Sequence, residues 1–138
     1  MSYIPSALKI LIVENHPDTL RYIKDYIQLM GHEVHIASDK TSALKILSNS
    51  SLDVLISDIH LPDGDGWELM KKAKELQPRL FGIAMSGLGS KADCKQSHSA
   101  GFQQHLAKPF LPEDLEALLL EAAKSLPLVA SKIRLPIQ

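Results

Sequence analysis

The chain has 138 residues, the size of one ordinary domain, which is enough to bury a hydrophobic core. Hydrophobic residues make up 45% and charged residues 22% of the sequence, and the formal net charge is only −1. Because neither sign of charge predominates, we expect no direct binding of nucleic acid or of an acidic membrane surface. The single cysteine, Cys94, has no partner for an internal disulfide, which is typical of the cytoplasm, where we expect the protein.

Short apolar runs alternate with segments of helical periodicity along the chain. The runs are rich in Ile, Val and Leu and predict β-strands at residues 8–13, 34–37, 53–57 and 81–85, with a weaker one at 103–107. Each run is nearly continuous in apolar character, whereas a half-exposed strand alternates. The strands are therefore predicted to form a parallel sheet that helices cover on both faces.

Four helices are predicted from apolar residues that recur three and four positions apart. The boundary signals are Pro17 and Gly31 for the first helix, Ser38 or Asp39 at the start of the second, Pro78 at the end of the third and Pro112 at the start of the last. The segment 91–100 is nearly polar all round. We predict a fifth helix there only because of its place in the alternation.

Functional residues of such a sheet are expected at the carboxyl ends of the strands, where the strand order reverses. The polar residues that follow the apolar runs are Glu14, Asn15, His16, Ser38, Asp39, Asp58, His60, Ser86 and Lys108. Carboxylate and carbonyl oxygens among them suit a hard divalent cation such as Mg²⁺. A hydroxyl and a lysine suit phosphoryl oxygens, and an aspartate between them can become an aspartyl phosphate.

Four segments with this spacing resemble the receiver domain of two-component response regulators. They are ILIVENHPDT, DVLISDIHLPDGDGWELM, GIAMSG and AGFQQHLAKPF. The resemblance runs from about residue 8 to about residue 124, and the last two segments are particularly similar to receivers of hybrid sensor histidine kinases. It implies a flavodoxin-like, doubly wound α/β fold of five βα units with strand order 2-1-3-4-5. It also implies a receiver domain at 1–124 and a C-terminal extension or linker at 125–138.

The same resemblance implies a role for the candidate catalytic residues. Asp58 matches the phosphoacceptor, and Lys108 matches the lysine that pairs with the phosphoryl group. Ser86 matches the hydroxyl that binds a phosphoryl oxygen and shifts on activation. The two later aspartates of the same segment, Asp63 and Asp65, are then assigned to the turn before the third helix, where aspartate binds nearby backbone N–H groups.

The implied metal ligands are the side chains of Asp58, Glu14 and Asn15 and the backbone carbonyl of His60. Asn15 departs from the family pattern, which usually has an aspartate there. A pair of unit charges about 4 Å apart is worth roughly 4 kcal/mol at an effective dielectric constant near 20, before dehydration costs. Because asparagine lacks that charge, we expect Mg²⁺ to bind weakly and the metal-free fold to be relieved of some repulsion.

His105 is a second departure, since many receivers have a tyrosine or phenylalanine there that swings inward on activation. Two interpretations are open. His105 is a switch whose rotation depends on pH, or it lies partly exposed at the strand edge and does not respond. His32 and His35 flank the second strand and are predicted to face water.

The function that the resemblance implies is that of a phosphorelay receiver. Asp58 accepts a phosphoryl group from a phosphohistidine with the help of a divalent cation, and the surface then switches for a partner. The expected partner is a histidine kinase or a histidine phosphotransfer protein, and the expected state is a monomer or weak dimer. The domain is not expected to be an enzyme beyond self-catalysed phosphotransfer and autodephosphorylation. The alternative is a pseudo-receiver, used for protein–protein interaction, whose metal binding is weakened by Asn15.

Overall fold

The computed structural model describes residues 7–87 and 91–125. Its central sheet has five parallel strands, namely β1 (Lys9–Val13), β2 (Glu33–Ala37), β3 (Val54–Asp58), β6 (Phe81–Ser86) and β7 (Gln104–Ala107). Their order across the sheet is β2-β1-β3-β6-β7. Strands β6 and β7 are the fourth and fifth strands of this sheet along the chain. The observed order is therefore the predicted order 2-1-3-4-5, and the flavodoxin-like fold is confirmed.

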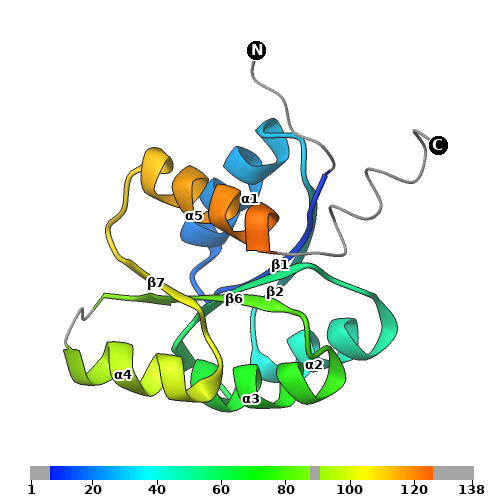
Figure 1. Cartoon of the computed structure of the whole chain (residues 1–138), viewed down its shortest axis with the longest axis vertical. Coiled ribbons are helices and arrows are strands. Elements are labelled where there is room, and N and C mark those ends of the chain that lie inside the picture. The colour runs from blue at the N-terminus through cyan, green and yellow to red at the C-terminus, as the bar shows by residue number, and fades with distance from the viewer. Residues whose placement is uncertain (1–6, 88–90, 126–138) are drawn as a thin grey trace.

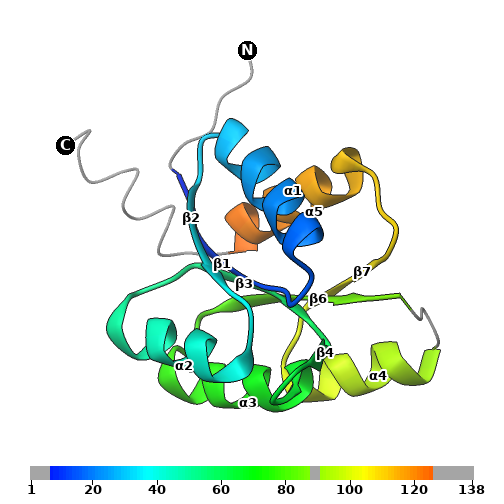
Figure 2. The same ribbon diagram turned by 180° about the vertical axis from the view of Figure 1, so that it is seen from behind.

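Helices cover both faces of the sheet. They are α1 (Pro17–Leu29), α2 (Lys40–Asn49), α3 (Gly66–Leu76), α4 (Lys91–Ala100) and α5 (Pro112–Ser125). Figures 1 and 2 show α1 and α5 on one face and α2, α3 and α4 on the other. The predicted helices are all present. They include the polar helix at 91–100, which was predicted only from the alternation of strands and helices.

Capping residues account for the ends of the first two helices. The chain leaves α1 through Gly31, whose φ of +95° lies in the left-handed region that glycine adopts without a Cβ clash. Ser38 and Asp39 were both candidates for the N-cap of α2, and the N-cap in the structure is Asp39. Its carboxylate accepts the N–H of Ser42 at 2.8 Å. Such a bond satisfies one of the four N–H groups that the first turn of a helix leaves without a partner.

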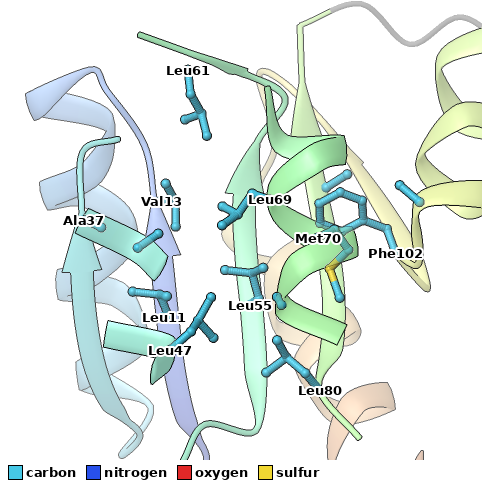
Figure 3. Packing of buried hydrophobic residues seen from close by; sticks show 14 of the residues in the cluster. Leu11, Val13, Ala37, Leu47, Leu55, Leu61, Leu69, Met70, Leu80 and Phe102 are labelled. Atoms are coloured by element: carbon cyan, nitrogen blue, oxygen red, sulfur yellow. The ribbon is translucent and has the colours of Figure 1, made fainter. Parts of the chain in front are cut away.

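Two hydrophobic clusters fill the space between the sheet and its helices. Because successive residues of a strand point to opposite faces, each buried strand contributes to both clusters. In β1, Ile10 and Ile12 join the cluster that includes residues of α1 and α5, whereas Leu11 and Val13 join the cluster that includes residues of α2 and α3. Figure 3 shows the second cluster, where Leu69 of α3 packs on the sheet. Burial of both faces explains why the strands read as continuous apolar runs.

A small antiparallel hairpin follows β3 and was not predicted from the sequence. It consists of β4 (His60–Leu61) and β5 (Gly64–Asp65). Asp65 then caps α3, and its carboxylate accepts the N–H of Glu68 at 2.8 Å. The turn predicted for Asp63 and Asp65 is thus a hairpin that leads directly into a helix.

Within the ranges 7–87 and 91–125, no helix is both long and apolar enough to cross a membrane. The last helix ends at Ser125, close to the predicted boundary between the receiver domain and its extension. Residues 126–138 lie outside the described residues, so the extension stays a prediction.

Candidate functional site

The parallel sheet brings the candidate residues to one edge. Glu14 follows β1, and Asp58 is the last residue of β3, the neighbouring strand. Asp58 is paired with Met85 of β6, which directly precedes Ser86, the last residue of that strand. Lys108 follows β7, and its backbone N–H donates to the carbonyl oxygen of Ser86 at 2.8 Å. Residues that are far apart in the chain therefore share the carboxyl edge of the sheet.

Lys108 binds two carboxylates at this edge. Its Nζ lies 2.6 Å from Oε1 of Glu14 and 3.1 Å from Oδ2 of Asp58. The side chain of Glu14 is 2% exposed, that of Asp58 14% and that of Lys108 26%. Because water is largely excluded from Glu14 and Asp58, their interaction with the ammonium is stronger than that of a surface pair, and it offsets the cost of burying charge.

Backbone N–H groups bind the remaining oxygens of both carboxylates. The N–H of His16 donates to Oε2 of Glu14 at 3.0 Å, and the N–H of His60 donates to Oδ1 of Asp58 at 3.2 Å. Each carboxylate is therefore held between a backbone donor on its own loop and the ammonium of Lys108. This arrangement fixes the orientation of the Asp58 carboxylate at the rim of the site.

The ammonium form of Lys108 is favoured by its surroundings. Burial on its own lowers the pKa of this lysine, but its hydrogen bonds to Glu14 and Asp58 and the charges of these two carboxylates raise it by more. The pKa of Lys108 is therefore above its ordinary value. The side chain therefore stays positively charged throughout the physiological range.

The other predicted site residues lie beside this cluster. Ser86 is buried, with 2% of its surface exposed, whereas Asn15 in the loop after β1 and His60 at the start of β4 are exposed. The structure thus brings Glu14, Asp58 and Lys108 into direct contact and places the other three at the same edge of the sheet. The roles assigned to all six residues stay predictions.

The donor set of the site fits a hard cation. It offers the carboxylates of Asp58 and Glu14, the amide oxygen of Asn15 and the carbonyl oxygen of His60, and oxygen atoms are the ligands that Mg²⁺ prefers. In the described part of the chain, no group of three or more His, Cys, Asp and Glu side chains is placed to hold a metal ion. The predicted set contains only two such side chains, so Mg²⁺ would retain several water ligands.

His105 is partly exposed, but its ring nitrogens do not lie in solvent. Both ring nitrogens are buried, and neither has a hydrogen-bond partner among the described residues. The ring borders a cavity of about 200 Å³ between α4 and β7 whose lining includes Cys94 and His98. Burial lowers the pKa of His105, and the charge of Asp93 partly opposes this. The expected partial exposure of His105 is therefore confirmed for the residue as a whole, although its ring nitrogens are buried, and both the switch role and the lack of response stay predictions.

His32 also differs from its expectation. The sequence predicted that it faces water, but the ring is half-buried and its Nδ1 accepts the N–H of Leu8 at 3.0 Å. Burial lowers the pKa of His32. Residue 8 precedes the first strand and residue 32 the second, so only the pairing of β1 with β2 brings these groups together, and no local sequence signal marks the contact.

A second cavity adjoins the ion-paired cluster. It has a volume of about 450 Å³, and its lining consists of Asp18, Thr19, Tyr22, Lys108, Pro109 and Phe110. The first three residues belong to α1, and the last three follow β7. Lys108 therefore borders both this cavity and the carboxylates of the site. The sequence did not identify the hollow, because it depends on how α1 packs beside the segment after β7.

Comparisons with known proteins agree with this geometry. Residues 10–120 match the family model of the response regulator receiver domain. The chain is 26% identical over 112 residues to the sensor histidine kinase RcsC of Salmonella typhi and 30% identical over 116 residues to the sensor protein EvgS of Escherichia coli (strain K12). These matches cover 81% and 84% of this chain but only 12% and 10% of the two relatives. The predicted similarity to receivers of hybrid sensor kinases is thereby confirmed.

Solved structures show the same fold. A CheY-like response regulator receiver domain protein from Methanospirillum hungatei JF-1 is 31% identical, with a TM-score of 0.81 over 87% of this chain and 97% of that one. The receiver domain of the sensor histidine kinase PA1611 from Pseudomonas aeruginosa PAO1 is 22% identical, with a TM-score of 0.77 over 88% and 99% of the two chains. The active-site cleft of that second protein holds a magnesium ion. With the family model matched over most of its length, the chain belongs to the receiver domains of two-component response regulators.

Proposed function

We propose that this receiver domain accepts a phosphoryl group on Asp58 from the phosphohistidine of a histidine kinase or a histidine phosphotransfer protein. The observation that carries the proposal is the position of Lys108, whose ammonium bridges the carboxylates of Asp58 and Glu14 at the carboxyl edge of the sheet. A nucleophilic carboxylate and a fixed positive charge for the incoming phosphoryl oxygens are thereby present at one point.

The transfer is an exchange of one bond to phosphorus for another. A carboxylate oxygen of Asp58 attacks the phosphorus atom, the P–N bond to the donor imidazole breaks, and its electron pair stays on that nitrogen. Lys108 and the hydroxyl of Ser86 bind phosphoryl oxygens, and the N–H of His60 holds the carboxylate in place. Mg²⁺, held by Asp58, Glu14, Asn15 and the carbonyl of His60, would offset the repulsion between carboxylate and phosphoryl group.

The domain catalyses phosphorylation of its own aspartate and slow hydrolysis of the product, and it does not act as an enzyme on free substrates. Ser86 and His105 are the proposed switch residues that pass the change to the surface around α4 and β7. Weak Mg²⁺ binding is part of the proposal, because Asn15 supplies no charge.

The donor protein is proposed to dock over the cavity beside Lys108, since α1 and the segment after β7 form its walls.

We further propose a cytoplasmic receiver that works as a monomer or weak dimer. The free thiol of Cys94 is exposed, which suits a reducing compartment. The proposed monomer or weak dimer is supported by the distribution of exposed large apolar side chains. They include Leu29, Ile36, Leu76 and Leu120, which belong to four different elements rather than to one continuous helix or strand.

A second candidate function is favoured by Asn15 itself. Only two carboxylates contribute to the metal site, so a pseudo-receiver that binds a partner without efficient phosphorylation is the alternative. The retention of Asp58, Ser86 and Lys108 favours the phosphoacceptor over this alternative, because a binding module has no need of the three together.

Intact-mass measurement after incubation with acetyl phosphate and MgCl₂ tests the proposal. We expect the native chain to gain one phosphoryl group and the Asp58→Asn variant to gain none. Asp25→Asn is the matched control, since it makes the same chemical change at an exposed aspartate of α1. If the native chain gains no phosphoryl group from acetyl phosphate or from a phosphohistidine donor, the pseudo-receiver is the correct function.

A further inference from the structure

Asp63, at the tip of the β4–β5 hairpin, binds the start of α2. Its Oδ1 accepts the backbone N–H of Lys40 at 2.7 Å. Its Oδ2 accepts the backbone N–H of Thr41 at 2.9 Å and the hydroxyl of the same residue at 2.7 Å. The hydrogen bond from the Thr41 hydroxyl is the largest cause that lowers the pKa of Asp63 to about 2, so the carboxylate is charged at any physiological pH.

The base of the same hairpin is packed against the backbone of the phosphoacceptor. The N–H of Gly66 donates to the carbonyl oxygen of Ile59 at 2.7 Å. A Cβ atom at Gly66 would lie 2.4 Å from the carbonyl oxygen of Asp58, so only glycine permits this approach. The hairpin is thus anchored at its base beside Asp58 and at its tip, through Asp63, on α2.

The start of α2 is also connected to the opposite side of the site. The backbone N–H of Glu14 donates to the carbonyl oxygen of Ala37, the last residue of β2, at 3.0 Å. Only Ser38 and the cap Asp39 separate Ala37 from the first turn of α2. A short, capped segment therefore contacts both the loop that carries Glu14 and Asn15 and the hairpin that carries His60.

We propose that Asp63 is a positioning residue for the candidate site, acting through the hairpin on the Asp58 carboxylate and the His60 carbonyl. Its bonds to α2 set the position of these oxygens relative to Glu14 on the other loop. The inference rests on the proposed function, because it assigns Asp63 to the same metal and phosphoryl site. With two carboxylates instead of three, the affinity for a cation depends strongly on the placement of the donors that remain.

Asp63→Asn and Glu68→Gln form a matched pair of variants. The carboxylate of Glu68 forms an ion pair with Nζ of Lys40, so it also links α2 to a neighbouring element. Each change removes one negative charge and keeps the side-chain size, but only Asp63 lies in the hairpin. Thr41→Val is a third variant, which removes one hydrogen bond to Asp63 without changing the charge.

Mg²⁺ affinity, measured by the chemical shifts of the backbone amides near the site, separates these variants. We expect about a tenfold loss in Asp63→Asn, as for other residues that orient metal ligands, and a smaller loss in Thr41→Val. Glu68→Gln should stay within about twofold of the native chain, since it tests charge alone. Urea unfolding of each variant, run in parallel, shows whether that variant is fully folded under the conditions of the Mg²⁺ titration.

Hydrogen exchange of the His60 and Gly66 amides in metal-free protein is the second readout. Asp63→Asn should accelerate both amides, whereas Glu68→Gln should leave them unchanged. Equal losses of affinity in Asp63→Asn and Glu68→Gln, or unaltered exchange in Asp63→Asn, would overturn the positioning role. Failure of the native chain to bind Mg²⁺ or to become phosphorylated would instead contradict the proposed function, and the exchange data still decide whether Asp63 places the hairpin.

Discussion

Lys108 and its two carboxylates form a charge cluster whose balance depends on the neighbouring asparagine. The cluster contains one ammonium and two carboxylates, all partly or fully withdrawn from water. An aspartate in place of Asn15 would add a third negative charge next to Glu14. With asparagine at position 15, we therefore expect the site to form more easily without a cation and to bind a cation more weakly.

Asn15→Asp should strengthen Mg²⁺ binding by roughly tenfold or more. The added charge contributes a gross attraction near 4 kcal/mol, and a net gain of about 1.4 kcal/mol after dehydration costs already raises the affinity tenfold. The same variant should be less stable than the native chain in the presence of EDTA, owing to repulsion among three carboxylates. Metal titration and urea unfolding measure the two effects. Unchanged affinity would show that position 15 does not contact the cation.

A side-chain hydrogen bond joins the third and fourth helices. Nε1 of Trp67 in α3 donates to the hydroxyl of Ser97 in α4 at 2.9 Å, and Ser97 is 2% exposed. The described side chains of α4 are otherwise mostly polar and exposed, and besides Ser97 only Ala100 is buried. This bond therefore contributes to the attachment of α4, whose residues line the same cavity as His105.

Ser97→Ala should reduce the free energy of unfolding by about 1–2 kcal/mol, since it leaves the indole N–H of Trp67 without its partner. The fluorescence of Trp67, the only tryptophan of the chain, should change at the same time. Ser99→Ala, at an exposed position of the same helix, is the control and should alter neither quantity. An effect of equal size in both variants would mean that helix propensity, not the hydrogen bond, is responsible.

Elements with a clear period or a continuous apolar run were predicted to within a residue or two, as β1 and α1 show. The β4–β5 hairpin was missed, because strands of two residues are too short to show a period. Asp63 was assigned to a turn, but its binding to α2 was not predicted, since the two segments are 22 residues or more apart.

The stability of the whole molecule should depend on pH through two partly buried histidines, His32 and His105. Burial lowers the pKa of His32 and His105 in the folded chain below the ordinary value of about 6.5. Between the two values the unfolded chain binds more protons, so stability falls as the pH decreases below about 6.5. The lowered pKa values of Asp63 and Glu68 reduce the stability of the fold only at more acidic pH. The raised pKa of Lys108 reduces it only at strongly alkaline pH.

Urea unfolding at pH 7.5 and 5.5 should therefore show a lower free energy of unfolding at the acidic pH. His105→Phe should reduce this difference, because it removes one of the two partly buried imidazoles whose pKa is lowered by burial. His98→Gln, an exposed histidine of α4, is the control and should leave the difference unchanged. A native chain that is equally stable at both pH values would contradict the argument.

At the level of the whole molecule, the sequence was sufficient for the fold and for placing the candidate residues at one edge of the sheet, but not for their contacts. Asp58 and Lys108 could be identified because parallel strands place their carboxyl ends together. The ion pair between Lys108 and Glu14 joins residues 94 positions apart, and its geometry depends on side-chain packing that no local pattern encodes. The buried ring nitrogens of His105 likewise depend on how α4 lies over β7.

The strand topology has a practical consequence for experiments on this domain. A parallel strand begins at the edge of the sheet opposite Asp58, and α5, which returns after the last strand, ends near that same edge. A linker, dye or solid support joined at Ala7 or at Ser125 is therefore attached on the side remote from the ion-paired cluster. Phosphate donors and docking proteins can then be tested against an immobilised chain whose reactive edge remains open.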